Sequence, residues 1–464
     1  MSDRLLIIGG NAAGMSCASQ ARRLRAAGDL EIDVVEAGQW TSYSNCGIPY
    51  WVGGQVEEAE SLIARSPAAF ADLDINIRSG SRAERIDLDA GTVTVRSTVG
   101  NRSGEGGEGG EGGEGASSTL GYDRLMIATG AVPLRPPVEG LDADGVFGVQ
   151  TIPDGEAILR ALEKQPKRAV VLGGGYIGLE IAEALVTQGL SVTVVLADPL
   201  PMASLDEDMG ERVCAAMTAL GIEMRPCEPV RGIEVKSGLA RAVVTDEGSY
   251  PADLVVLGLG VRPNSDLARD AGLRIGTTRG IEVDDTMRTP THEQVYAAGD
   301  CIQTRNRITG HPMAIALGTH ANRQGRVAGT NIGGRPARFD GVIGTAVTKV
   351  GNCEIGRTGL STKEAEQAGY SIETTLVEST VKAGYYPDAG KLAVKLLTEK
   401  HTQRMLGGQI VGGPGSAKRI DVLATAIWTQ LTAAEFASVD ISYAPPFSPV
   451  FDAVALAARK AAGR

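Results

Sequence analysis

The sequence has few aromatic residues, no long apolar run and fewer basic than acidic residues. Aromatics make up 4% of the 464 residues, so the cores must rely on Ala, Val, Ile and Leu, which the apolar total of 43% allows. No apolar stretch approaches about 18 residues, so no membrane-spanning helix is predicted. The net charge of −11, from 45 Lys and Arg against 56 Asp and Glu, disfavours a nucleic-acid-binding surface but permits a local anion site.

The six cysteines are scattered and form no recognisable pair. They are Cys17, Cys46, Cys214, Cys227, Cys301 and Cys353. No two have the spacing of metal ligands, so no metal site is predicted, and a chain of this length needs no disulfide framework. The N-terminal MSDRLLIIGG enters a strand at once, without a basic region, an apolar stretch and a cleavage site. We therefore expect a protein of the reducing cytoplasm that binds neither membrane nor nucleic acid.

One strand–helix–strand pattern occurs twice in the chain. Residues 4–8, RLLII, predict a buried parallel strand, which is followed by glycines, a helix and a second strand at 31–36. The pattern returns at 168–196, which indicates an internal duplication of a nucleotide-binding unit. After residue 335 the pattern changes to antiparallel strands and an amphipathic helix, typical of an α+β domain.

Residues 103–115, SGEGGEGGEGGEG, form a low-complexity segment. Glycine loses much entropy on ordering and the repeated glutamates repel one another. We predict a disordered, solvated insertion between two strands.

The first glycine turn carries a dinucleotide fingerprint. It reads Gly9-x-Asn11-x-x-Gly14 and is followed by Glu36 at the end of the second strand. Gly9 allows the tight turn, Gly14 lets the helix approach the strand, and the helix N-terminus suits a pyrophosphate. Glu36 can accept hydrogen bonds from both ribose hydroxyls.

The second fingerprint, Gly173-x-Gly175-x-x-Gly178, is complete. Its second strand ends at Leu196, where an NADH site would favour an acid, and Asp198 follows two residues later. No arginine follows closely, as a 2′-phosphate would favour. A nicotinamide cofactor is predicted, and the choice between NADH and NADPH stays open. The chain is therefore expected to be an α/β protein with two Rossmann-like nucleotide-binding domains and a C-terminal α+β domain.

Two further strands end in residues that suit a flavin. The segment YDRLMIATGA ends in Ala128, Thr129 and Gly130, and VYAAGDCIQT carries Asp300 after a glycine. An acid at such a strand end can approach a ribitol chain or a phosphate closely.

In this order, the motifs resemble those of the flavin-dependent pyridine nucleotide–disulfide oxidoreductases along nearly the whole chain. The resemblance implies FAD bound by residues 1–150 and 256–334, and NADH or NADPH bound by residues 151–255. It also implies a homodimer joined through the dimerisation domain, residues 335–464. In GYIGLE, it implies that Tyr176, Ile177 and Glu180 contact the nicotinamide cofactor.

The cysteine segment, TSYSNCGIPYWVGG, distinguishes subgroups of this family. Two-cysteine members carry CxxxxC here and a histidine near the C-terminus, whereas this chain has Cys46, then Trp51, and no histidine in YAPPFSPVFD. It resembles the single-cysteine subgroup of coenzyme A disulfide reductases, persulfide or polysulfide reductases, NADH oxidases and NADH peroxidases. There a thiolate beside the flavin attacks a disulfide or sulfane sulfur, or is oxidised by peroxide to a sulfenic acid.

Three features favour a disulfide or persulfide substrate. Peroxidases and water-forming oxidases of the subgroup have a histidine three residues after the first fingerprint glycine, where this chain has Ala12. Ser42 and Asn45, before Cys46, resemble the coenzyme A disulfide reductase motif. The resemblance further implies that Tyr385 and Tyr443, from the partner subunit, protonate a departing thiolate.

The substrate class stays open within this subgroup. Gln20 and Arg23, in SQARRLR, match positions that contact coenzyme A, although the same segment fits a solvated basic helix end. A polysulfide or another small disulfide would use the same Cys46 and tyrosines. The alternatives are an NADH oxidase that reduces oxygen, and a flavoprotein redox sensor in which Cys46 responds without turnover.

Overall fold

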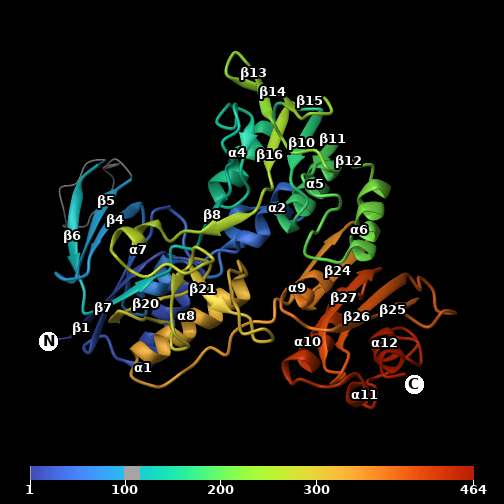
Figure 1. The fold of residues 1–464 in the computed structure, drawn as a ribbon. Helices are drawn as coiled ribbons and strands as arrows, with labels where there is room; N and C mark the ends of the chain where they lie inside the picture. Colours follow the sequence, from blue (N-terminus) through green and yellow to red (C-terminus); the bar gives the residue numbers. More distant parts are fainter. Residues whose placement is uncertain (1, 99–114, 464) are drawn as a thin grey trace. The chain divides into compact units, whose positions relative to one another are not determined.

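A computed structural model describes residues 2–98 and 115–463 (Figure 1). The described residues divide into two compact units. Unit 1 comprises described residues of Met1–Asn45, Glu58–Leu134 and Val261–Val342, and unit 2 those of Cys46–Glu57, Arg135–Gly260 and Ile343–Arg464. Nearly all of the predicted insertion at 103–115 lies outside the described residues.

Unit 1 is built around a six-stranded sheet in the order β19-β20-β7-β1-β2-β3. All neighbouring strands are parallel except β19 and β20. The strands are β1 (Asp3–Ile8), β2 (Leu30–Val35), β3 (Ile75–Arg78), β7 (Arg124–Ile127), β19 (Arg288–Thr289) and β20 (His292–Ala297). The continuous apolar sequences of β1 and β7 suit parallel strands that are covered on both faces.

Helices α1 (Ala12–Leu24) and α8 (Gly318–Ile332) pack closely in unit 1 because small residues face each other. A Cβ at Gly325 would lie 2.1 Å from the carbonyl oxygen of Ala13, so only glycine permits this approach. An antiparallel sheet is added by β4 (Ser81–Asp87), β5 (Thr92–Ser97) and β6 (Ser117–Gly121). The two strands that flank the predicted insertion, β5 and β6, therefore pair with each other.

The remaining elements of unit 1 are short. They are η2 (Ala59–Leu62), α3 (Pro67–Ala71), α7 (Asp266–Asp270), β8 (Ala131–Pro133), β17 (Val261–Pro263), β18 (Ile281–Glu282), β21 (Ile302–Arg305) and β22 (Pro312–Met313). Strands β8 and β17 form an antiparallel ladder, and β18, β21 and β22 form a small sheet.

Unit 2 contains the second parallel sheet, in the order β12-β11-β10-β16-β9. Its strands are β9 (Val146–Phe147), β10 (Arg168–Leu172), β11 (Ser191–Val195), β12 (Glu223–Arg225) and β16 (Leu254–Leu257). The accompanying helices are α2 (Ile48–Val52), α4 (Ile152–Leu162), α5 (Tyr176–Thr187) and α6 (Glu207–Ala219). A three-stranded antiparallel sheet consists of β13 (Gly232–Lys236), β14 (Leu239–Val244) and β15 (Ser249–Pro251).

The C-terminal part of unit 2 is an antiparallel sheet in the order β23-β24-β27-β26-β25 (Figure 1). Its strands are β23 (Ala346–Val350), β24 (Cys353–Gly359), β25 (Ile372–Thr380), β26 (Lys391–Glu399) and β27 (Met405–Gly412). The helical elements are α9 (Thr362–Gln367), η3 (Ala417–Arg419), α10 (Ile420–Trp428), α11 (Ala433–Phe436) and α12 (Ala453–Ala461). The two predicted nucleotide-binding folds and the α+β C-terminal part are therefore confirmed.

Candidate active site

The first glycine turn is closed by contacts that only glycine allows. Gly9 has a φ of +109°, and a Cβ there would lie 2.2 Å from the carbonyl oxygen of Ala128. A Cβ at Gly14 would lie 1.9 Å from the carbonyl oxygen of Gly9. The turn therefore brings the ends of β1 and β7 and the start of α1, with Ala12 as its first residue, close together.

Glu36 and Asn11 organise the surroundings of this turn. The Glu36 carboxylate accepts hydrogen bonds from the backbone N–H groups of Gly10 and Gly38, each at 2.7 Å. The Asn11 side chain donates to Asn45 Oδ1 at 2.6 Å and accepts from the Tyr43 N–H at 3.1 Å. The predicted cofactor residue Asn11 and the predicted substrate residue Asn45 thus lie in direct contact.

Ser42, another predicted substrate residue, is tied to the same turn. Its N–H donates to the carbonyl oxygen of Gly10 at 2.9 Å, and its φ is +51°. A non-glycine residue rarely adopts this conformation, so the surrounding hydrogen bonds must hold it there.

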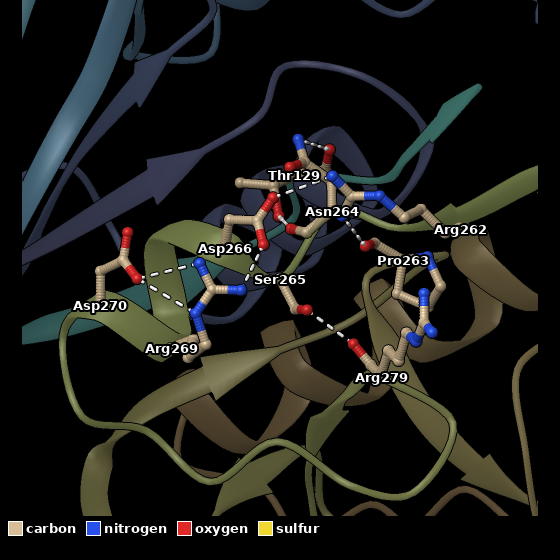
Figure 2. Close-up of polar contacts among 9 residues, drawn as sticks. All are labelled: Thr129, Arg262, Pro263, Asn264, Ser265, Asp266, Arg269, Asp270 and Arg279. Atoms are coloured by element: carbon tan, nitrogen blue, oxygen red, sulfur yellow. Dashed lines mark hydrogen bonds and ion pairs between the residues drawn. The ribbon is translucent and has the colours of Figure 1, made fainter. Parts of the chain in front are cut away.

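The Ala128–Gly130 segment is held by a residue that the sequence did not suggest. Figure 2 shows Asn264 opposite Thr129, with reciprocal hydrogen bonds between them. Thr129 Oγ1 donates to the carbonyl oxygen of Asn264 at 2.6 Å, and Asn264 Nδ2 donates back to the carbonyl oxygen of Thr129 at 3.1 Å. The Asn264 N–H donates to the carbonyl oxygen of Gly130 at 2.9 Å. In Figure 2, arginine–aspartate contacts flank this pair, including Arg262 with Asp266 at 3.1 Å.

The polar groups of unit 1 fit a bound dinucleotide. Gly299 lies beside the middle of α8, because its N–H donates to Gln324 Oε1 at 2.9 Å. Burial raises the pKa of the adjacent Asp300 carboxyl to about 6. Among the described residues, neither ring nitrogen of buried His320, in the first turn of α8, has a hydrogen-bond partner, and neither does Thr41 Oγ1. Buried polar atoms are rarely left unpaired, so these groups suit FAD.

The two predicted coenzyme A contacts lie farther along α1. Gln20 is half-buried, and Arg23 is exposed on the last turn. The neighbouring Arg22 is engaged otherwise, since it donates to the carbonyl oxygens of Leu73 and Asp74 at 3.0 and 2.8 Å. Gln20 and Arg23 stay predicted substrate contacts.

The second glycine turn, in unit 2, repeats the geometry of the first. Gly173 has a φ of +100°, and a Cβ there would lie 2.4 Å from the carbonyl oxygen of Gly258. A Cβ at Gly178 would lie 2.1 Å from the carbonyl oxygen of Gly173, whereas Gly175 faces open space. This open position lets a pyrophosphate approach the backbone at the start of α5.

Cys46 is exposed in the 3-10 helix η1 (Asn45–Gly47), directly before α2. Of the six cysteines, only Cys46 and Cys227 are exposed. Trp51, where two-cysteine enzymes carry the second sulfur, is buried at 8% exposure. A Cβ at Gly155, in α4, would lie 2.6 Å from the Trp51 ring, so the indole packs directly on that helix. The second sulfur is thus replaced by a packing residue.

Glu180, predicted as a cofactor contact in α5, lies near α2. Its Oε1 accepts a hydrogen bond from Thr348 Oγ1 at 2.7 Å and a longer one from the Tyr50 hydroxyl at 3.5 Å. Burial is the main factor that raises the pKa of Glu180, and the Thr348 hydrogen bond partly opposes it. Burial also raises the pKa of Tyr176, at the start of the same helix.

The two predicted catalytic tyrosines meet on adjacent loops of the C-terminal part. Desolvation is the main factor that raises the pKa of Tyr443, and the neighbouring Tyr385 raises it further. Tyr385 is 78% exposed and Tyr443 46%. A half-buried arginine that sequence reasoning missed, Arg419, donates to the carbonyl oxygens of Val381 and Phe447 and thereby anchors both loops.

The described residues contain neither a cluster of metal ligands nor a membrane-spanning helix. No group of three or more His, Cys, Asp or Glu side chains in them could hold a metal ion. None of their helices has the length and apolar character needed to cross a membrane.

Two nucleotide-binding folds followed by an antiparallel C-terminal sheet define a dinucleotide-dependent oxidoreductase. Residues 3–325 match the sequence model of the pyridine nucleotide-disulphide oxidoreductases, and residues 345–455 match the dimerisation domain of the same proteins. The chain belongs to the pyridine nucleotide-disulphide oxidoreductase family. This confirms the resemblance inferred from the motifs.

Relatives within the family carry several activities. The chain is 39% identical to an NAD(P)H sulfur oxidoreductase (CoA-dependent) of Pyrococcus abyssi, over 98% of this chain and 97% of that one. It is 37% identical to an NADH oxidase of Methanocaldococcus jannaschii, over 99% and 98%. An NAD-dependent persulfide reductase structure from A. fulgidus superposes with a TM-score of 0.93 at 39% identity, covering 99% of this chain and 83% of that one.

Proposed function

We propose that this protein is an NADH-dependent flavoprotein that reduces a disulfide or persulfide of the coenzyme A type through Cys46. The observation that carries the proposal is the exposed Cys46 thiol directly before α2, with buried Trp51 in place of a second sulfur. Two relatives, named as a sulfur oxidoreductase and a persulfide reductase, match this chain over nearly its full length and support the same substrate class.

FAD, when bound, would supply the electron transfer from the nicotinamide to sulfur held on Cys46. In unit 1, Glu36 would bind the adenosine ribose, the turn from Gly9 to Gly14 the pyrophosphate, and Asp300 the ribityl chain. Cys46 as a thiolate attacks one sulfur of R–S–S–R, forms Cys46–S–S–R and releases R–S⁻. Two electrons and one proton then break the mixed disulfide into the Cys46 thiolate and R–SH.

The Tyr385–Tyr443 pair would supply a proton in the second step. Because desolvation and the neighbouring Tyr385 raise the pKa of Tyr443, the phenol is protonated at neutral pH and a proton is available there. We assign this role to Tyr443 of the partner subunit, with Tyr385 orienting it. Both tyrosines are exposed residues of the dimerisation domain. The segment that carries Tyr443 also exposes Phe447, Val450 and Phe451, at 75%, 65% and 54%. We call these five side chains the exposed cluster.

That cluster is proposed as the surface that a second copy of the chain covers. Soluble monomers rarely expose contiguous apolar patches of this kind without a partner. A homodimer would cover it and deliver the tyrosines to the partner's thiol.

NADH rather than NADPH is proposed as the electron donor. Leu196, at the end of β11, is 2% exposed and its Cδ2 would lie 2.5 Å from a Cβ at Gly174, so an apolar side chain fills the usual place of the ribose-binding acid. Asp198 is exposed two residues later, and residues 197–205 contain no Lys or Arg. Nearby Arg225 is paired with Glu223. A 2′-phosphate would therefore meet a carboxylate and no available cation on this loop.

NADH oxidation by oxygen is the second candidate, because one relative is a named NADH oxidase. Ala12 leaves α1 without the histidine that oxygen and peroxide chemistry uses in the family. Anaerobic assays with coenzyme A disulfide and persulfide, beside aerobic assays without them, separate the two functions. Fast anaerobic turnover that Cys46→Ser abolishes supports the proposal, whereas oxygen-dependent NADH loss unaffected by disulfide supports the oxidase.

A further inference from the structure

Cys46 and Tyr50 lie one helical turn apart. Cys46 belongs to η1 and Tyr50 to α2, which begins at the next residue after η1. Residues four apart in continuous helical structure project from the same side. The Tyr50 hydroxyl in turn reaches Glu180 Oε1 at 3.5 Å, and Thr348 Oγ1 donates to that same oxygen at 2.7 Å. The Cys46 thiol, the Tyr50 phenol and the Glu180 carboxyl therefore form a sequence in which Tyr50 lies between the other two.

The electrostatics of the three groups are linked. Burial is the main factor that raises the pKa of Tyr50 to about 12, and the charges of Glu180, Glu183 and Cys46 raise it as well. The phenol consequently keeps its proton at neutral pH. Burial likewise raises the pKa of Glu180, so this carboxyl takes up a proton more readily than an exposed glutamate.

We propose that Glu180 and Tyr50 form a proton relay for Cys46. Glu180 is protonated while Cys46 carries a negative charge, and it delivers its proton through the Tyr50 hydroxyl when that charge is consumed. The inference rests on the proposed function, in which Cys46 is the reacting thiol. The relay protonates the R–S⁻ that is released when the mixed disulfide forms, whereas Tyr443 protonates the one released when the mixed disulfide is reduced.

The step balances as a proton transfer coupled to thiol–disulfide exchange. Cys46–S⁻, R–S–S–R and Glu180–COOH become Cys46–S–S–R, R–SH and Glu180–COO⁻. One S–S bond breaks, another forms, and no electrons enter. Tyr50 passes its own proton to R–S⁻ and takes the proton of Glu180, so it ends the step unchanged.

The protonation states of Cys46 and Glu180 are coupled, because a thiolate and a carboxylate on either side of the Tyr50 phenol repel each other. Groups that interact in this way titrate as a set rather than singly. When the mixed disulfide forms, Cys46 loses its charge and the proton affinity of Glu180 falls. The released R–S⁻ needs a proton at the same moment.

Other charged groups face Glu180 and modulate the relay without replacing it. From α5, Glu183 raises the pKa of Glu180, and from β23, Lys349 lowers it. Lys349 and Glu183 form an ion pair at 2.7 Å, which largely compensates their opposing effects. Tyr176, on the preceding turn of α5, also interacts with Glu180.

Alkylation of Cys46 by iodoacetamide across pH tests the relay without any substrate. The holoenzyme is labelled at a series of pH values, and the Cys46 peptide is quantified by mass spectrometry. The exposed Cys227 gives an internal reference thiol in the same samples. The variants are Tyr50→Phe, Glu180→Gln and Thr348→Val, and Tyr370→Phe is a control that removes a phenol from the turn before β25.

The relay predicts that Tyr50→Phe and Glu180→Gln change the alkylation of Cys46 in opposite directions. Tyr50→Phe removes a donor to the thiolate, so alkylation of Cys46 at neutral pH should fall about tenfold, which corresponds to one pKa unit. Glu180→Gln cannot become a carboxylate, so no second negative charge disfavours the Cys46 thiolate, and alkylation should rise. Thr348→Val should act like Glu180→Gln but more weakly, because Glu180 loses a hydrogen bond that favours its ionised form. Alkylation of Cys227 should be the same in every variant, and alkylation of Cys46 in Tyr370→Phe should match that of the wild type.

The proposal is overturned if either Tyr50→Phe or Glu180→Gln leaves the Cys46 profile unchanged, or if both shift it in the same direction. Flavin absorbance checks that each variant is folded. The outcome is independent of the proposed function, which fails separately if Cys46→Ser still reduces the disulfide.

Discussion

Tyr443 lies next to Tyr385 on loops that the sequence separates widely, and Tyr385 helps to raise the pKa of Tyr443. The pair provides a protonated phenol on an exposed surface. We predict that Tyr443→Phe slows disulfide reduction on the order of 100-fold, the usual contribution of general acid catalysis. Turnover with NADH and disulfide measures the loss, and FAD content should not change. Tyr386→Phe, which alters the neighbouring phenol, is the matched control. Equal turnover of Tyr443→Phe and the wild type would remove the tyrosine from the mechanism.

Arg419 positions both tyrosine-bearing loops and should matter for stability. It pairs with Asp452 at 2.8 Å, and the two side chains are only 12% and 9% exposed. Breaking a buried pair leaves an unpaired charge and typically costs about 3 kcal/mol or more. Arg419→Ala should therefore lower the denaturant midpoint and also slow disulfide reduction. The neighbouring Lys418→Ala, whose side chain is 81% exposed, should change neither. Wild-type stability of Arg419→Ala would contradict the anchoring role.

The loop after β11 should select against a 2′-phosphate. We predict that the wild-type protein binds NADH more tightly than NADPH by at least about tenfold, equivalent to roughly 1.4 kcal/mol. Asp198→Arg should narrow or reverse this ratio, because it exchanges a carboxylate for a phosphate-binding cation. Dissociation constants from fluorescence titration measure the effect without turnover. Asp142→Arg, an equal charge change elsewhere in unit 2, controls for net charge. Tighter NADPH binding by the wild-type protein would contradict the assignment.

The raised pKa of the Asp300 carboxyl should make the stability of the flavin-free protein depend on pH. Its folded-state pKa is raised from 3.8 to about 6 by burial, so the unfolded chain loses this proton first as pH rises. The free energy of unfolding should fall between these two values and stay lower above them. Asp300→Asn should remove this contribution and stabilise the apoprotein above pH 6 by up to about 3 kcal/mol. Chemical denaturation at low and neutral pH tests this. A wild-type protein whose stability rises relative to Asp300→Asn over that interval would exclude it.

The sequence predicts the two nucleotide-binding folds because each depends on local constraints. The Gly9 and Gly173 turns need conformations that glycine supplies, and the strands before them are continuously apolar. Asn264 could not be predicted in the same way. Its contact with Thr129 depends on the pairing of β8 with β17, which brings distant segments together.

The same limit applies around Cys46. The cysteine and the tyrosines are recognisable from their motifs, and Trp51 can be read as a missing sulfur. The hydrogen bonds from Tyr50 and Thr348 to Glu180 join α2, β23 and α5, which no local pattern connects. Arg419 is inconspicuous for a similar reason, since nothing in the segment SAKRID reveals which loop carbonyls it meets.

A covalent adduct on Cys46 tests the central claim most directly. The oxidised protein is reduced with NADH and freed of the excess, then treated with one equivalent of coenzyme A disulfide in the absence of oxygen, and its peptides are analysed by mass spectrometry. We predict a coenzyme A mixed disulfide on the Cys46 peptide that further NADH removes, while the exposed Cys227 stays unmodified or keeps its adduct. An adduct that never forms on Cys46, or one that persists on Cys46 after NADH is added, would contradict the account.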